Sequence, residues 1–158
     1  MILATLLGDA QWQWLEKKLV ETADVRLICS GTQIVDDAKG MQEWGNFPLE
    51  RKRLFDLIES TGARGVLFLS GNVHYAEVCR SHEGPYPMVD FTSSGMTHNS
   101  ADYAAFKSPY RVAGAYAEPN FGLVEIDWYA PGSAEIRLKI MGDGAVVDGY
   151  SVRLGELA

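Results

Sequence analysis

The strongest constraint on the fold is an almost unbroken apolar run at residues 65–70, GVLFLS, which follows the helix-stopping residue Gly62. A strand that is apolar on both sides is expected to be covered on both faces, as in a parallel sheet flanked by helices. It must also reach a parallel neighbour through a crossover segment, because tight turns join only antiparallel strands. The run therefore favours an α/β fold in which residues 65–70 form a central strand.

The residues before this run predict two helices and one further strand. Residues 9–19 carry apolar side chains at helical spacing, and we expect Asp9 to cap this helix. Residues 25–29 form a short β-type run. Pro48 is expected to open the second helix and Gly62 to end it, because proline suits the first helical turn and glycine the residue after the last. The first half therefore predicts two βα-type units.

The second half changes to strands separated by turns. Residues 86–92, 121–128, 134–141 and 146–154 show apolar or alternating patterns with Gly, Pro and Asp between them. Residues 99–118 have no clear period and are expected to form an ordered loop. The predicted fold class is thus α/β, with two βα-type units followed by a mainly antiparallel β region.

Length and composition predict one globular domain over residues 1–158. The apolar fraction of 47% and the charged fraction of 22% are ordinary for such a domain. No run is long enough to span a bilayer, and Met1–Leu7 is too short and lacks the basic flank of a signal peptide. We therefore expect a cytoplasmic protein without a membrane partner. Cys29 and Cys79 lie in apolar runs and are expected to be buried free thiols.

The net charge of −7 argues against binding to a nucleic-acid backbone. An acidic chain can still act on phosphate esters, but a bound metal cation would then have to supply the positive charge.

The segment directly after the apolar run, Gly71-Asn72-Val73-His74, contains the first candidate site residues. Open α/β sheets place their ligand-binding groups at the carboxyl ends of strands. The imidazole of His74 suits zinc or iron, and the amide oxygen of Asn72 suits a harder position. From these residues alone, two interpretations of His74 stay open. A structural histidine held by hydrogen bonds is more common at such a position than a metal ligand.

A second cluster, residues 92–98 (TSSGMTH), also follows a predicted strand. The hydroxyls of Ser93, Ser94 and Thr97 could bind a substrate oxyanion, and His98 could act as a metal ligand or a general acid. The competing interpretation is a turn rich in serine and threonine, whose hydroxyls cap the backbone.

Three weaker candidates have simpler alternatives. Glu77 could hold the ring of His74 in place, although an exposed strand carboxylate is the commoner case. Gln33 follows the first predicted strand, at the same end of the sheet as Asn72, and a simple polar loop is its default interpretation. His82 lies in a polar stretch that is typical of a solvated hairpin turn.

Together these segments resemble the alkaline phosphatase D family of the calcineurin-like metallophosphoesterase superfamily. The resemblance lies in LGDAQWQWL at residues 7–15, WGNFP at 44–48, SGNVHYAE at 70–77, TSSGMTH at 92–98 and NFG at 120–122. It implies the C-terminal part of a metallophosphoesterase α/β sandwich.

The resemblance also implies roles for individual residues. His74 falls on a metal-ligand position, and Asn72 falls where the family usually has aspartate, so a cation there loses one negative ligand. The upstream motifs that supply most ligands of the family's two-metal centre are not present in this sequence. The resemblance thus implies a metal-dependent hydrolase of small phosphoesters with a reduced site, or one completed by a second copy. Zinc is the first expectation, followed by iron, manganese or calcium.

Other interpretations stay open at this stage. The chain could be a non-catalytic remnant that acts as a self-associating or interaction module, or a fragment of a longer protein. Half of a sandwich exposes an apolar edge that must be covered, which favours a two-fold homodimer. The resemblance also implies that full-length relatives include exported proteins.

Overall fold

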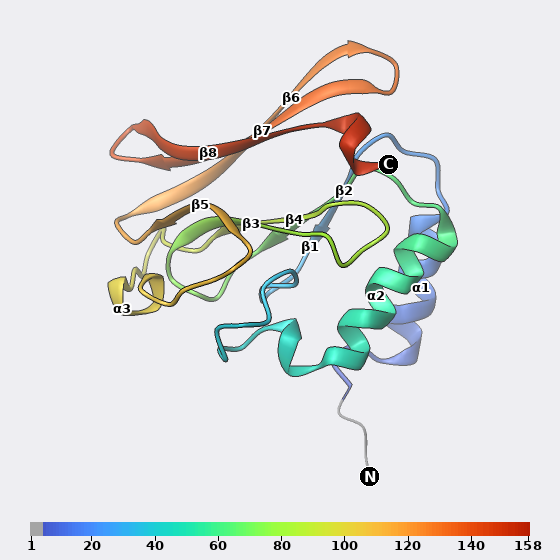
Figure 1. Ribbon diagram of the computed structural model, residues 1–158, viewed down its shortest axis with the longest axis horizontal. Coiled ribbons are helices and arrows are strands. Elements are labelled where there is room, and N and C mark those ends of the chain that lie inside the picture. Colours follow the sequence, from blue (N-terminus) through green and yellow to red (C-terminus); the bar gives the residue numbers. More distant parts are fainter. Residues whose placement is uncertain (1–4) are drawn as a thin grey trace.

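The computed structural model describes residues 5–158, which form two stacked β-sheets with two helices against the outer face of the larger sheet (Figure 1). The elements, in chain order, are α1 (Asp9–Leu19), β1 (Arg26–Cys29), η1 (Trp44–Asn46), α2 (Pro48–Thr61), β2 (Val66–Ser70), β3 (Ala76–Ser81), β4 (Met88–Ser93), α3 (Ala101–Ala104), β5 (Arg111–Tyr116), β6 (Asn120–Ala130), β7 (Ser133–Gly142), β8 (Ala145–Arg153) and η2 (Leu154–Leu157).

The larger sheet has the strand order β1-β2-β4-β3-β5. Strands β1, β2 and β4 run parallel, and β3 runs antiparallel to both β4 and β5. The apolar run forms β2, whose Val66 and Phe68 are fully buried between two neighbouring strands and two layers. Helix α2 begins at Pro48 and ends at Gly62, which has the left-handed conformation (φ 63°) of a helix-terminating glycine. The predicted α/β fold class is therefore confirmed.

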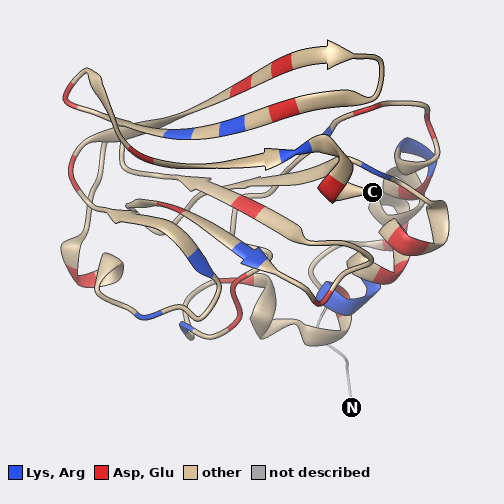
Figure 2. Cartoon of the chain, turned by 45° about the horizontal axis from the view of Figure 1, so that its top comes forward, with Lys and Arg blue, Asp and Glu red and all other residues tan. Residues whose placement is uncertain are grey.

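The smaller sheet is an antiparallel meander with the order β6-β7-β8. Burial alternates along its central strand, with apolar side chains turned to the larger sheet and Glu135, Arg137 and Lys139 turned to the outside. The inward residues are Ala134, Ile136, Leu138 and Ile140, all buried. On the outer face Arg137 and Lys139 pair with Glu125 and Asp127 of β6, so that acidic positions of one strand lie beside basic positions of the next (Figure 2).

Three local predictions are wrong. Asp9 does not cap α1, because Gly8 is the N-cap and Asp9 is already helical. Residues 99–118 are not a loop throughout, since they contain α3 and β5. Cys29 is an exposed free thiol, while Cys79 is buried as expected. The physical reason for the exposure of Cys29 is that β1 lies at the edge of the sheet, where the outer side of the strand has no neighbour among the described strands.

One hydrophobic core runs through both sheets and the helices, from Trp12 to Leu157. This continuity supports our proposal that residues 1–158 form one domain. Within the described residues, no helix combines the length and the apolar character that crossing a bilayer requires. The expectation for Met1–Leu7 rests partly on residues 1–4, which lie outside the described residues, and the cytoplasmic location stays a prediction.

Candidate metal-binding site

The loop that follows β2 has an unusual backbone. Asn72 and His74 both have positive φ angles, 73° and 61°. Residues other than glycine rarely adopt this left-handed backbone conformation, and each one held there destabilises the fold by on the order of 1 kcal/mol or more. Such residues occur where surrounding contacts enforce them, and they are concentrated at functional sites. The loop is therefore held in place by its neighbours.

The backbone of His74 is held by the chain that follows β4. Its N–H donates to Oγ of Ser94 at 3.2 Å, and its carbonyl accepts from the N–H of Ser100 at 2.9 Å. Because β2 and β4 are adjacent parallel strands, the two segments that follow them meet at one edge of the sheet.

This arrangement brings the rings of His74 and His98 together. Their centroids lie 5.8 Å apart with a 36° angle between the ring planes. An ion about 2.0–2.1 Å from one nitrogen of each ring would lie about 3 Å from each centroid, so the two rings are close enough to share a single ion. His74 is half-buried and His98 is exposed, and the two residues fit a metal site with open positions.

The other members of the predicted site lie around this pair. Asn72 is exposed, and its Nδ2 donates to Oε1 of Gln42 at 3.2 Å. The hydroxyl of Thr97 lies 3.2 Å from Nδ1 of His98. Within residues 5–158, no group of three or more His, Cys, Asp or Glu ligand atoms includes His74. Among residues 5–158, the pair therefore offers two imidazoles without a carboxylate that completes a group of three.

The three predicted substrate-binding hydroxyls do not form one group. Ser94 accepts the His74 N–H, and Thr97 lies beside His98. Ser93 instead borders a cavity between the two sheets, together with Phe91 and Val124. Of the three, only Thr97 is exposed and also contacts the histidine pair.

Glu77 and Gln33 lie below the loop in a buried polar cluster. Glu77 is 0% exposed, which corrects the expectation of an exposed strand carboxylate. Gln33 is buried too, so it does not belong to a simple polar loop, and its Nε2 donates to Glu77 at 2.6 Å. Glu77 also accepts from Nε of Arg111 at 2.6 Å and from the ammonium of Lys39. Among its hydrogen bonds in residues 5–158, none joins Glu77 to His74.

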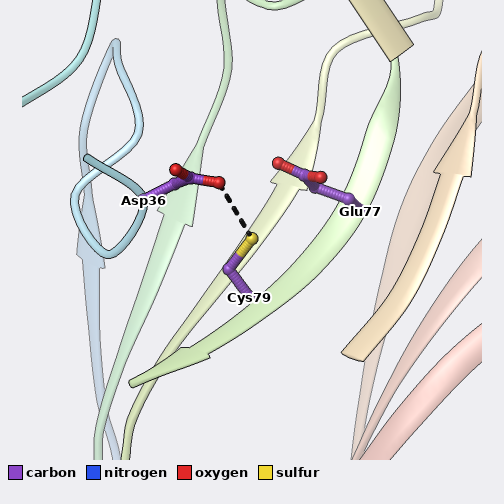
Figure 3. A group of neighbouring side chains, drawn as sticks. All are labelled: Asp36, Glu77 and Cys79. Carbon is purple, nitrogen blue, oxygen red and sulfur yellow. Dashed lines mark hydrogen bonds between the residues drawn. The ribbon is translucent and has the colours of Figure 1, made fainter. Parts of the chain in front are cut away.

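The same cluster contains a group with the composition of a metal site. Ligand atoms of Asp36, Glu77 and Cys79 lie within 4.8 Å of one another (Figure 3). The ammonium of Lys39 already contacts Glu77 and lies 2.9 Å from Asp36, and it therefore supplies the positive charge there. Burial raises the pKa of the Cys79 thiol far above its ordinary value, so the thiolate that a metal needs does not form. These residues do not fit a metal ion.

The charges in this cluster make the free energy of unfolding depend on pH. Burial opposes ionisation of Glu77, but the charge of Lys39 and the hydrogen bonds from Lys39, Arg111 and Gln33 together outweigh it, and the pKa of Glu77 lies below its ordinary value of 4.5. The unfolded chain therefore binds more protons near this pH than the folded chain does. We expect the free energy of unfolding to be highest above about pH 5 and to fall as the pH drops through about 4 and below. Urea unfolding at several pH values measures this, and a flat profile down to about pH 3 would contradict it.

Sequence reasoning missed three contributors to the site. Gln42 contacts Asn72, Ser100 binds the His74 carbonyl, and the ring of Tyr103 lies 5.8 Å from that of His74. Ser100 and Tyr103 belong to the stretch that was expected to be a loop. The available signal for the short helix α3 was Ser100, because serine is a favoured N-cap residue and its hydroxyl accepts the N–H of Tyr103, three residues later.

Comparison with known proteins identifies the family. The family model for PhoD-like phosphatases matches residues 3–138. The chain belongs to the PhoD-like phosphatase family. This confirms the family expected from the sequence, and a solved structure of PhoD is similar in fold, with a TM-score of 0.62 and 18% sequence identity. That alignment covers 93% of this chain and 32% of the PhoD chain. Among curated protein sequences, none matches.

Proposed function

We propose that this PhoD-like chain is a metal-dependent phosphoester hydrolase with a reduced metal site. The observation that carries the proposal is the convergence of His74 and His98, which follow different strands and whose rings lie 5.8 Å apart. Family membership supports hydrolysis of small phosphoesters as the activity. In this proposal His74 and His98 bind the ion, with Asn72 as a weaker third ligand.

The remaining site residues have secondary roles in the proposal. A bound zinc ion, or iron, manganese or calcium in its place, would polarise the phosphoryl oxygen and lower the pKa of an attached water. Thr97, whose hydroxyl lies 3.2 Å from Nδ1 of His98, would donate a hydrogen bond to a phosphoryl oxygen. With Asn72 as the weaker third ligand, one position of a tetrahedral site would stay open for water, substrate or a group from a second copy.

Hydrolysis of an activated aryl phosphodiester and the matching monoester tests this function. Chelator-treated protein is expected to be inactive and to regain activity when zinc or manganese is returned. Full activity in the metal-free protein would overturn the proposal.

Restoring the family's aspartate at position 72 should strengthen the site. Asn72→Asp adds a negative ligand, and Asp tolerates the left-handed backbone (φ 73°) about as well as Asn does. We expect zinc to bind about tenfold more tightly, a gain of about 1.4 kcal/mol. Calorimetric titration of both proteins measures the change, and Asn46→Asp, at an exposed position of η1, serves as the control. Equal affinity in Asn72→Asp and the starting protein would remove Asn72 from the ligand set.

A second candidate function, a self-associating module, is supported by the open edge of the larger sheet. Strand β1 pairs only with β2 among the described strands. Leu27 of β1 is 46% exposed, and Trp14 on the adjacent helix α1 is 55% exposed. Unpaired strand edges beside apolar side chains favour association with another strand. We propose a two-fold dimer in which the β1 edges of two copies pair antiparallel.

The oligomeric mass by light scattering tests this second candidate. We expect a dimer, and we expect Leu27→Lys to shift it to the monomer, because a charge at a strand edge opposes edge-to-edge pairing. Leu123→Lys, on the exposed outer face of β6, is the matched control. A monodisperse monomer at micromolar concentration would contradict the dimer.

A further inference from the structure

We propose that residues Ser94–Tyr103 form a clamp that positions His74, with Ser94 and Tyr103 as positioning residues of the site. This inference rests on the proposed function in so far as the positioned residue is a metal ligand. We call this segment the His74 clamp, or simply the clamp.

The clamp binds the backbone of His74 on both sides. Ser94 accepts the His74 N–H through its hydroxyl, and the N–H of Ser100 donates to the His74 carbonyl at 2.9 Å. Together these two bonds fix both peptide groups that flank a residue in the left-handed conformation. An isolated loop would relax such a residue toward a commoner conformation. The clamp thus supplies the contacts that keep the backbone of His74 in this conformation, with its ring 5.8 Å from that of His98.

The ring of His74 also has a neighbour from the clamp. The Tyr103 ring lies 5.8 Å from it, at an interplanar angle of 36°. Ser100 links the two contacts, because its Oγ also accepts the N–H of Tyr103 at 3.3 Å and so fixes the turn that carries the Tyr103 ring. Aromatic rings at such separations attract one another, which biases the orientation of a half-buried ring.

The clamp is anchored to the rest of the protein. The carbonyl of Gly95 accepts the N–H of Asn120, at the start of β6, at 3.1 Å. A Cβ at Gly95 would lie 2.0 Å from Nδ2 of Asn120, so the contact requires glycine. The position of the clamp is thereby fixed relative to both sheets, because the clamp follows β4 and bonds to the first residue of β6. A rigid support of this kind is what a ligand needs when few other ligands define the site.

This geometry gives Ser94 a different role from the one its sequence context predicts. Its hydroxyl oxygen accepts the backbone N–H of His74, so its main contribution is to hold the ligand rather than the substrate. The two roles have different signatures. Loss of a positioning residue weakens metal binding and alters His74 itself, whereas loss of a substrate-binding residue raises KM alone.

Ser94→Ala and Ser94→Thr separate these roles. Zinc affinity by calorimetry is expected to fall about tenfold in Ser94→Ala and to be restored in Ser94→Thr, which keeps the hydroxyl. In metal-free protein, the NMR signals of the His74 ring and amide are expected to shift in Ser94→Ala and return in Ser94→Thr. Ser151→Ala, an exposed serine of β8, is the matched control.

Tyr103 gives an independent test. Tyr103→Phe keeps the ring and is expected to match the wild type, while Tyr103→Ala is expected to weaken zinc binding about tenfold. Unchanged His74 signals and zinc affinity in both Ser94→Ala and Tyr103→Ala would overturn the clamp. If the wild type binds no zinc, the proposed function fails, but the NMR signals of metal-free His74 still decide whether the clamp positions it.

Discussion

Replacement of Lys39 by methionine is expected to destabilise the fold by about 3–5 kcal/mol, because it leaves buried carboxylates without their counter-ion. The Lys39 ammonium contacts Glu77 and Asp36, and the side chains of all three are fully buried. Arg111 compensates only one of the two carboxylates. Methionine fills a similar volume but supplies no charge, so the second carboxylate must take up a proton or draw water into the interior.

Urea unfolding of Lys39→Met at neutral pH measures this loss. Lys52→Met is the matched control, because Lys52 pairs with Asp56 at the surface, where the two side chains are 70% and 57% exposed. That exposed pair contributes about 0.3–0.5 kcal/mol at most. A loss of less than about 1 kcal/mol in Lys39→Met would show that the buried cluster does not depend on this ammonium.

Removal of the His74 imidazole is expected to lower metal-dependent hydrolysis by more than about 100-fold, since even outer partners of metal ligands cost 10–100-fold when removed. His74 provides one of the two imidazoles of the proposed site. Hydrolysis rates of His74→Ala at saturating metal give the result. Because His74 holds the left-handed conformation (φ 61°) and the substitution removes the contacts of its ring, unfolding is measured on the same sample.

His82→Ala is the control for this prediction. His82 lies exposed in the turn between β3 and β4, as the sequence predicted, and is expected to retain full activity. Equal loss in His82→Ala and His74→Ala would assign the effect to general damage, and equal retention would remove His74 from the catalytic site.

Those parts of the fold that follow from local rules are predictable from the sequence. The run at residues 65–70 forms β2, and Pro48 and Gly62 bound α2, because these signals act within a few residues. Strand β5 could not be predicted in this way, because its residues show no alternation of apolar and polar side chains. It is defined by its pairing with β3, which contains bulges. Pairing between segments far apart in the chain leaves no local pattern.

Some residues of the candidate site could be predicted from the sequence, and others could not. His74 and His98 each follow a strand, so a shared edge was predictable, and the adjacency of β2 and β4 brings them together. Glu77 looks like an exposed residue because its partner Lys39 lies 38 residues away. Tyr103 carried no signal of its own, because its position depends on Ser100, which binds both Tyr103 and His74.

The proposed function depends on a metal ion bound through His74 and His98. Calorimetric titration of zinc into the metal-free protein, alongside His74→Ala and His98→Ala, decides whether this ion binds. The proposed site predicts saturable binding of one ion per chain that is lost in both variants. Absence of binding in the wild type, or unchanged binding in His74→Ala, would contradict it.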